Sequence, residues 1–184
     1  MSTALSTASS TDVTAAATAP AAGPLPVVEN PRTPQELAAT VRSYAARVDL
    51  WEPLVRFTRP ERWWHRLAAG ADHEVWLLSW LPGQGTEIHD HGGASGAFGV
   101  VRGELTERSF VLPGAEAPRP PRARGLAVSA VRAFGPRHVH EVTNLGTEPA
   151  VSIHAYAPIL STMSYYTEAE DGALLLNRTD PIED

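Results

Sequence analysis

The chain has no cysteine among its 184 residues. A disulfide framework and a cysteine-based zinc site are therefore excluded, and the fold needs no oxidising compartment. Any bound metal must use histidine or carboxylate side chains as ligands. The sequence also lacks an apolar run of about 18 residues and the basic and then apolar start of a secretory signal. We therefore expect a cytoplasmic protein with no membrane partner.

The chain is also short of positive charge, since its formal net charge is -6. Such a surface repels phosphate backbones, so nucleic acid is not expected as a partner. Charged residues make up 20% of the chain, and 14 glycines and 16 prolines indicate many turns. This composition predicts a single β-rich globular domain, which we expect to be a monomer.

The first 28 residues are almost wholly Ala, Ser, Thr, Pro and Gly, which is too few large apolar groups for a packed core. We expect residues 1–28 to be a disordered tail and residues 29–184 to form the domain. A capping box of Thr33 and Glu36 predicts a helix that runs to about residue 46. A second short helix is expected over residues 50–57.

From residue 63 onward, short β-prone runs alternate with turn residues, which indicates a β-barrel or sandwich. The predicted strands cover residues 74–80, 98–103, 105–110 and 151–156. The Pro- and Arg-rich stretch 113–124 is expected to be an exposed loop, because proline cannot pair within a central strand. The acidic end, residues 168–184, is expected to be a partly ordered wrap or tail.

Two histidine pairs stand out, His89-Asp90-His91 and His138-Val139-His140. In a strand, residues i and i+2 face the same side, so His89 and His91 can reach one metal ion. The second pair can supply a third ligand from a neighbouring strand. Neutral imidazole binds Fe, Zn, Cu and Ni alike, so the residue types alone do not select the metal.

The spacing around these histidines resembles the two metal motifs of the cupin superfamily. Gly83 precedes His89 by six positions, Gly103 follows, and His140 with Asn144 forms a downstream H-x3-N. The resemblance implies a mainly β fold, a jelly-roll-like cupin β-barrel with a few N-terminal helices. It favours His140 over His138 as the third ligand.

One position departs from the general cupin pattern, because Gly96 stands where the first motif has a glutamate ligand. Three neutral histidines are then left, and a dication held by them keeps more positive charge than one with a carboxylate ligand. Such a site favours anionic partners such as thiolate and carboxylate.

Within the cupins the chain resembles the cysteine dioxygenase family. That resemblance implies an Fe(2+) site formed by His89, His91 and His140. It also implies that Ser152, His154 and Tyr156 are the family's serine-histidine-tyrosine triad, which orients the phenol toward bound oxygen or substrate. Animal members have a cysteine at the position of Gly96 that crosslinks to this tyrosine, whereas bacterial members commonly have glycine.

Family members that use cysteine place an arginine against the substrate carboxylate, and relatives specific for 3-mercaptopropionate have glutamine there. We expect Arg66 to be this substrate-binding residue, with Arg62 as the alternative. A surface arginine that pairs with Glu61 or Glu74 is the other interpretation of Arg66. Trp64 is interpreted either as a wall of the pocket or as core.

These features predict an oxidoreductase of cysteine catabolism that converts L-cysteine and O2 to cysteine sulfinic acid. 3-Mercaptopropionate is the alternative thiol substrate. A metal-binding cupin sensor without turnover, and a zinc or manganese cupin hydrolase or isomerase, are the alternatives from other functional classes.

Overall fold

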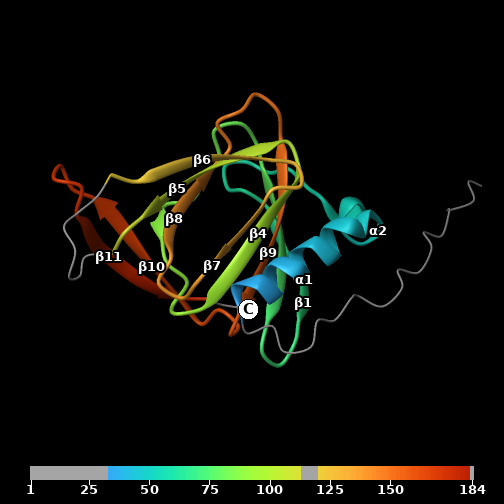
Figure 1. The fold of residues 1–184 in the computed structure, drawn as a ribbon. Helices are drawn as coiled ribbons and strands as arrows, with labels where there is room; N and C mark the ends of the chain where they lie inside the picture. The colour runs from blue at the N-terminus through green and yellow to red at the C-terminus, as the bar shows by residue number, and fades with distance from the viewer. Residues whose placement is uncertain (1–32, 113–119, 183–184) are drawn as a thin grey trace, which may run out of the picture.

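The computed structural model describes residues 33–112 and 120–182. The expected tail at residues 1–28 lies outside the described residues. Two antiparallel β-sheets face each other, and a helix lies along the outer side of one of them (Figure 1). The predicted mainly β architecture with N-terminal helices is confirmed.

The five-stranded sheet has the order β1-β2-β9-β4-β7. Its strands are β1 (Trp64–Ala69), β2 (Glu74–Trp80), β9 (Ala150–Ala157), β4 (Ser95–Arg102) and β7 (Val131–Phe134). The six-stranded sheet has the order β11-β10-β3-β8-β5-β6. Its strands are β11 (Leu174–Pro181), β10 (Thr162–Glu168), β3 (Ile88–His89), β8 (Val139–Thr143), β5 (Glu104–Phe110) and β6 (Arg122–Ala127).

Helix α1 (Pro34–Ala46) covers the outer face of the five-stranded sheet. It begins at a complete capping box, in which the Thr33 side chain accepts from the Glu36 N–H and the Glu36 carboxylate accepts from the Thr33 N–H. Its apolar stripe of Leu37, Val41 and Tyr44 is buried. The second helical segment is shorter than predicted and consists of α2 (Val48–Trp51) and the 3-10 turn Glu52–Leu54.

Strand β9 is central and buried on both faces. Its odd-numbered residues, Val151, Ile153 and Ala155, pack in the core beneath helix α1. Because side chains alternate along a strand, Ser152, His154 and Tyr156 then face the space between the two sheets. The alternation that keeps this core apolar therefore also places the predicted triad in the interior.

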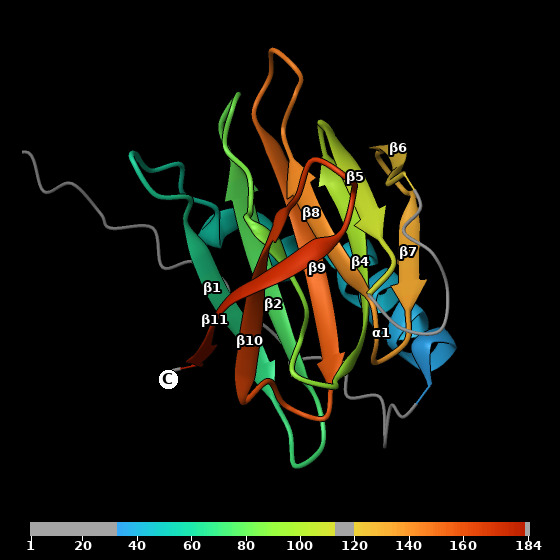
Figure 2. The same ribbon diagram turned by 90° about the vertical axis from the view of Figure 1, so that its left-hand side faces the viewer.

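Two expectations about the irregular segments are wrong. Residues 122–124 belong to strand β6, the edge of the six-stranded sheet, where proline-rich neighbours and exposed arginines are tolerated. Residues 113–119 lie outside the described chain. The acidic end was expected to be a partly ordered wrap or tail, but its residues 174–181 form strand β11, which pairs with β10 in an antiparallel hairpin that Figure 2 shows in front of the other strands.

Among the described residues, no helix is both long and apolar enough to cross a membrane.

Candidate metal centre

Three imidazoles meet at the inner side of the six-stranded sheet. His89 on β3 is the register partner of His140 on β8, and directly opposed residues of an antiparallel pair have side chains on the same face. His91 follows β3 in a turn, so the strand predicted over both histidines ends at His89. One nitrogen from each ring lies within 4.8 Å of the others, and all three side chains are buried.

The turn that carries His91 is fixed by Asp90. Its Oδ1 accepts from the backbone N–H groups of Gly92, at 3.0 Å, and Ser164, at 3.1 Å. Its Oδ2 accepts from the Tyr166 hydroxyl at 2.7 Å. Asp90 therefore ties the segment between two of the imidazoles to strand β10. No sequence motif indicates this role for Asp90.

The hydrogen-bond partners of the rings leave nitrogens available for a metal. His89 donates from Nδ1 to the carbonyl of Glu87 at 2.8 Å, so its Nε2 has a free lone pair. Both ring nitrogens of His91 are buried and have no hydrogen-bond partner within the described parts of the chain. Burial, together with the neighbouring imidazoles, holds the pKa of His89 and of His91 well below the ordinary value. Neutral, unpartnered imidazoles of this kind fit a divalent transition metal such as Fe(2+).

The structure gives a steric reason for the missing glutamate. A Cβ atom at Gly96 would overlap the Phe134 ring and lie 3.0 Å from Cδ1 of Tyr156. The same Phe134 ring stacks on His91, with centroids 4.9 Å apart. An aromatic ring therefore occupies the volume that a fourth ligand side chain would need, and the ligand set stays neutral.

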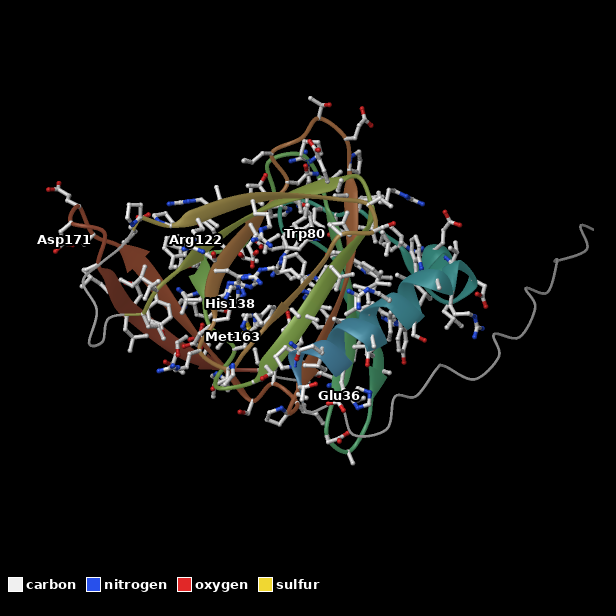
Figure 3. The ribbon with its side chains drawn as sticks, in the orientation of Figure 1. Glu36, Trp80, Arg122, His138, Met163 and Asp171 are labelled. Atoms are coloured by element: carbon white, nitrogen blue, oxygen red, sulfur yellow. The ribbon has the colours of Figure 1, made fainter. Side chains whose placement is uncertain are left out.

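The predicted triad forms a hydrogen-bonded row. Ser152 Oγ lies 2.8 Å from His154 Nε2, and His154 Nδ1 lies 3.1 Å from the Tyr156 hydroxyl oxygen. Trp80 on β2 adds a fourth member, because its indole N–H donates to Ser152 Oγ at 2.8 Å. Trp80 lies between the sheets in Figure 3.

The indole can only donate, so Ser152 Oγ accepts from Trp80 and turns its second lone pair and its own proton toward His154 Nε2. His154 is neutral, because burial lowers its pKa well below the ordinary value, so one of its ring nitrogens donates within the row and the other accepts. Burial also raises the pKa of Tyr156, so the phenol keeps its proton.

A cavity of about 250 Å³ adjoins the imidazoles and the phenol. Its described lining consists mainly of apolar side chains with a few polar groups: Arg62, Trp64, Trp76, Leu78, Trp80, Thr86, His89, His140, Val142, His154, Tyr156, Leu160, Met163, Pro181 and Ile182. Trp64 is thus a cavity wall that is 55% exposed, and it does not belong to the core.

Arg62 lines this cavity, whereas Arg66 does not. The Arg62 guanidinium lies 4.7 Å from the centroid of the Trp80 ring, and its Nη1 is buried without a hydrogen-bond partner among the described residues. Burial lowers the pKa of this guanidinium. Arg66 instead lies 3.8 Å from the buried carboxylate of Glu74 and 5.3 Å from the centroid of Trp76. The structure thus places the alternative arginine, and not the favoured one, beside the imidazoles.

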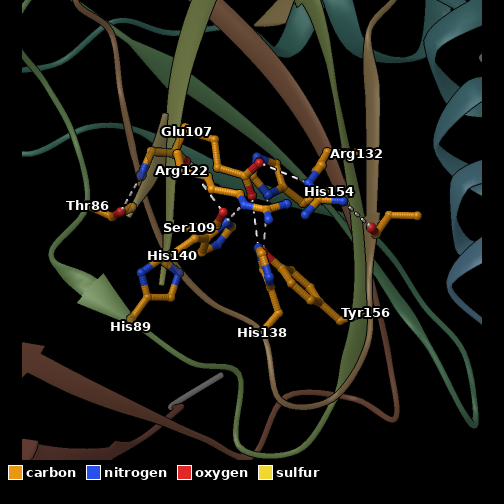
Figure 4. A network of polar contacts seen from close by, with 12 residues as sticks. Thr86, His89, Glu107, Ser109, Arg122, Arg132, His138, His140, His154 and Tyr156 are labelled. Carbon is orange, nitrogen blue, oxygen red and sulfur yellow. Dashed lines mark hydrogen bonds and ion pairs between the residues drawn. The ribbon is translucent and has the colours of Figure 1, made fainter. Parts of the chain in front are cut away.

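His138 is not one of the three clustered imidazoles. Its Nε2 lies 2.9 Å from Oε1 of Glu107, a buried carboxylate on β5 that also contacts His140 (Figure 4). Burial would raise the pKa of Glu107, but the hydrogen bonds from His138 and His140 outweigh it and hold that pKa well below the ordinary value. Glu107 is missing from the sequence-based site. The sequence could have indicated it, because Glu107 stands two positions after the apolar Leu105 in a predicted strand, and the two side chains therefore point to the same, inward face.

The comparisons with known proteins agree with this arrangement. The family model described as "Cysteine dioxygenase type I" matches residues 27–169. Cysteine dioxygenase type 1 of Danio rerio is 27% identical over 131 residues, which are 67% of this chain and 65% of that protein. The match therefore spans just under two thirds of the relative's length.

Two solved structures have a partly similar backbone trace. A protein from Thermus thermophilus has a TM-score of 0.49 and 22% identity over 58% of this chain and 92% of its own. A Klebsiella pneumoniae protein with a double-stranded β-helix domain has a TM-score of 0.48 and 20% identity over 69% and 93%. Since the family model covers well over half of the chain, the chain belongs to the cysteine dioxygenase type I family, whose fold is of the cupin type.

Proposed function

We propose that the chain is an Fe(2+)-dependent thiol dioxygenase that oxidises L-cysteine with O2 to cysteine sulfinic acid. One observation carries the proposal: three members of the hydrogen-bonded row, two of the three clustered imidazoles and the half-buried Arg62 line the same small cavity. A site that only binds a metal has no use for a buried hydrogen-bonded row that ends on a phenol.

The reaction is balanced without a further reductant, because a thiol and O2 together contain all the atoms of a sulfinic acid. Iron held by His89, His91 and His140 would coordinate the thiol and activate O2. The chain's own contribution is to hold the substrate in one orientation and to keep water out of a cavity with largely apolar walls.

In this proposal Arg62 binds the substrate carboxylate. Its guanidinium is the only positively charged group among the described cavity residues, apart from any protonated imidazole, and part of it has no protein partner. An arginine fork can pair both oxygens of a carboxylate. The ring of Trp80 supports one face of the guanidinium and so limits its movement.

Tyr156 donates its hydroxyl proton into the cavity. In the tautomer in which His154 donates from Nδ1, the phenol oxygen accepts from it and the phenol proton has no acceptor among its neighbours in the row. The hydroxyl can therefore orient the substrate or the oxygen that reacts with it.

The lining also supports a second substrate. None of the cavity residues in the described part of the chain is an aspartate or glutamate. An ammonium group therefore finds no carboxylate partner in the cavity, and 3-mercaptopropionate, which has no amine, fits as well. Arg62 would bind the carboxylate of either thiol.

The test is anaerobic loading with Fe(2+), followed by O2 uptake and mass-spectrometric detection of the sulfinate from each thiol. We expect one mole of sulfinate for each mole of O2 with L-cysteine, and a lower kcat/KM with 3-mercaptopropionate. The reverse order would assign the second substrate. Iron-loaded protein that makes neither sulfinate would contradict the proposal and favour a binding module.

We further propose that residues 29–184 act as one monomeric domain in the cytoplasm. Light scattering after size-exclusion chromatography checks the oligomeric state, and a dimer mass would contradict it.

A further inference from the structure

A buried carboxylate lies directly behind the metal-binding imidazoles. Glu107 on β5 is 1% exposed and points inward from the six-stranded sheet. Its Oε1 is 3.0 Å from His140 Nδ1 and 2.9 Å from His138 Nε2, and its Oε2 is 3.0 Å from Arg132 Nε. Figure 4 shows the three partners converging on this carboxylate. Strands β5, β7 and β8 and the turn before β8 all contribute to the cluster.

The chemistry of the carboxylate fixes the state of His140. An ionised carboxylate has only acceptor sites, so the proton of the 3.0 Å contact must be on His140 Nδ1. The lone pair of His140 is then on Nε2, the nitrogen left for the group formed with His89 and His91. His89 reaches the same tautomer through the Glu87 carbonyl, which is uncharged. Of these two ligands, His140 is therefore the one backed by a negative charge.

The other partners of Glu107 hold its carboxylate in place. Arg132 is a permanent cation, and its guanidinium is also held in place by the Ala133 carbonyl at 3.0 Å. His138 fills the second acceptor site of Oε1. Glu107, His138 and His140 also form a second group of potential metal ligands. Their facing ring nitrogens and carboxylate oxygen are already joined by hydrogen bonds, so this group is better explained as support for the metal site at His89, His91 and His140.

We propose that Glu107 is a positioning residue that keeps His140 in the metal-binding tautomer and supplies the negative charge that the three neutral ligands lack. This inference rests on the proposed metal site at His89, His91 and His140. With Gly96 at the position of the cupin glutamate, no carboxylate from that position contacts the metal. Glu107 instead places a carboxylate behind the His140 imidazole, one ring away from the metal. A carboxylate behind a histidine ligand raises the basicity of that ligand and fixes its orientation.

A purely structural ion pair between Glu107 and Arg132 is the rival explanation. The two explanations predict different effects of Arg132→Gln on metal affinity. If the charge of Glu107 acts on the metal, Arg132→Gln leaves that charge less neutralised, and metal affinity stays equal or rises. If the pair only stabilises the fold, both substitutions weaken metal binding together.

The experiment measures the dissociation constant for Co(II), added to the metal-free full chain, from its visible absorption at one fixed pH. Glu107→Gln keeps the shape and removes the charge, and we expect its dissociation constant to rise about 10- to 100-fold. Glu141→Gln is the matched control. Glu141 is adjacent to His140 in sequence, but it pairs with Arg108 and has no contact with the imidazoles. Its Co(II) affinity should equal that of the unsubstituted chain.

Thermal unfolding of the metal-free variants separates binding from folding. Unchanged Co(II) affinity in folded Glu107→Gln, or weaker binding in Arg132→Gln, would overturn the inference. If Glu107→Gln does not fold, the Arg132→Gln titration decides alone. Because Co(II) binding is read without turnover, the inference can hold while cysteine oxidation fails, and the two failures remain distinguishable.

Discussion

The two candidate arginines differ in their position relative to a strand. Arg66 lies within β1 opposite Trp76, where the carboxylate of Glu74 attracts it. Arg62 precedes β1, so strand periodicity says nothing about where it points. Sequence spacing identified both arginines, but the choice between them depended on tertiary contacts, and the sequence-based preference for Arg66 placed the charge outside the cavity.

Arg62→Gln should weaken catalysis with L-cysteine. Loss of a charged hydrogen bond costs about 1.5–3 kcal/mol, so kcat/KM should fall about 10- to 100-fold, mainly through KM. Arg66→Gln is the matched control, and its kcat/KM should stay within about 3-fold of the unsubstituted chain, because Arg66 does not line the cavity. Steady-state O2 uptake measures both. A larger decrease in kcat/KM for Arg66→Gln than for Arg62→Gln would instead support Arg66 as the substrate-binding arginine.

Tyr156→Phe removes the terminal proton of the row and leaves the imidazoles in place. We expect kcat to fall at least about 10-fold while the iron content stays unchanged, because general acid groups contribute about 10²–10⁴-fold. Trp80→Phe removes the indole donor, so Ser152 is free to rotate and the decrease in kcat should be smaller. Iron analysis beside single-turnover sulfinate yield makes the measurement. Equal loss of iron and turnover in Tyr156→Phe would contradict the role.

At the scale of elements, periodicity predicted the buried strands well. Strand β2 matches its predicted bounds, β5 begins one residue earlier than predicted, and β9 extends one residue farther at each end. These strands have strong apolar alternation, because one or both faces are buried. Strands β6 and β11 were missed, since these edge strands have mostly exposed side chains and lack a clear apolar alternation. The turn at His91 was missed because Asp90 and two glycines, rather than periodicity, end β3.

Strands β4, β7 and β9 pack tightly around Gly96. Gly96 pairs with Phe134 on one side and Tyr156 on the other. Gly96→Ala forces the Phe134 ring to move, and overpacking of this kind costs about 1–3 kcal/mol. Denaturant unfolding of the metal-free protein measures the loss. Adding Phe134→Leu to Gly96→Ala frees the volume of the ring and should recover more than half of the lost free energy of unfolding. A larger loss in this double variant would contradict the steric explanation.

At the scale of the whole molecule, the domain is expected to be independent of the N-terminal segment. Composition predicts that residues 1–28 add no packed core, and the described residues begin with the N-cap of α1. Deletion of residues 2–28 should leave the unfolding midpoint within about 2 °C and kcat/KM within about 2-fold, since a shift of 1 kcal/mol corresponds to about 2–4 °C at this size. A larger change in either quantity would show that the segment contributes to the domain.

Metal removal should be visible in the stability of the whole domain. The three imidazoles join the β3 turn to β8, and Asp90 joins the same turn to β10, so a bound metal links three strands of the six-stranded sheet. A metal that binds only the folded chain stabilises it by about 2.7 kcal/mol at a free concentration 100 times its dissociation constant. Chelation should therefore lower the unfolding midpoint by about 5–10 °C. His140→Ala removes one ligand and leaves its Glu107 partner bound to Arg132 and His138, so its midpoint should no longer respond to chelator. A chelator-dependent shift that persists in His140→Ala would place the metal elsewhere in the chain.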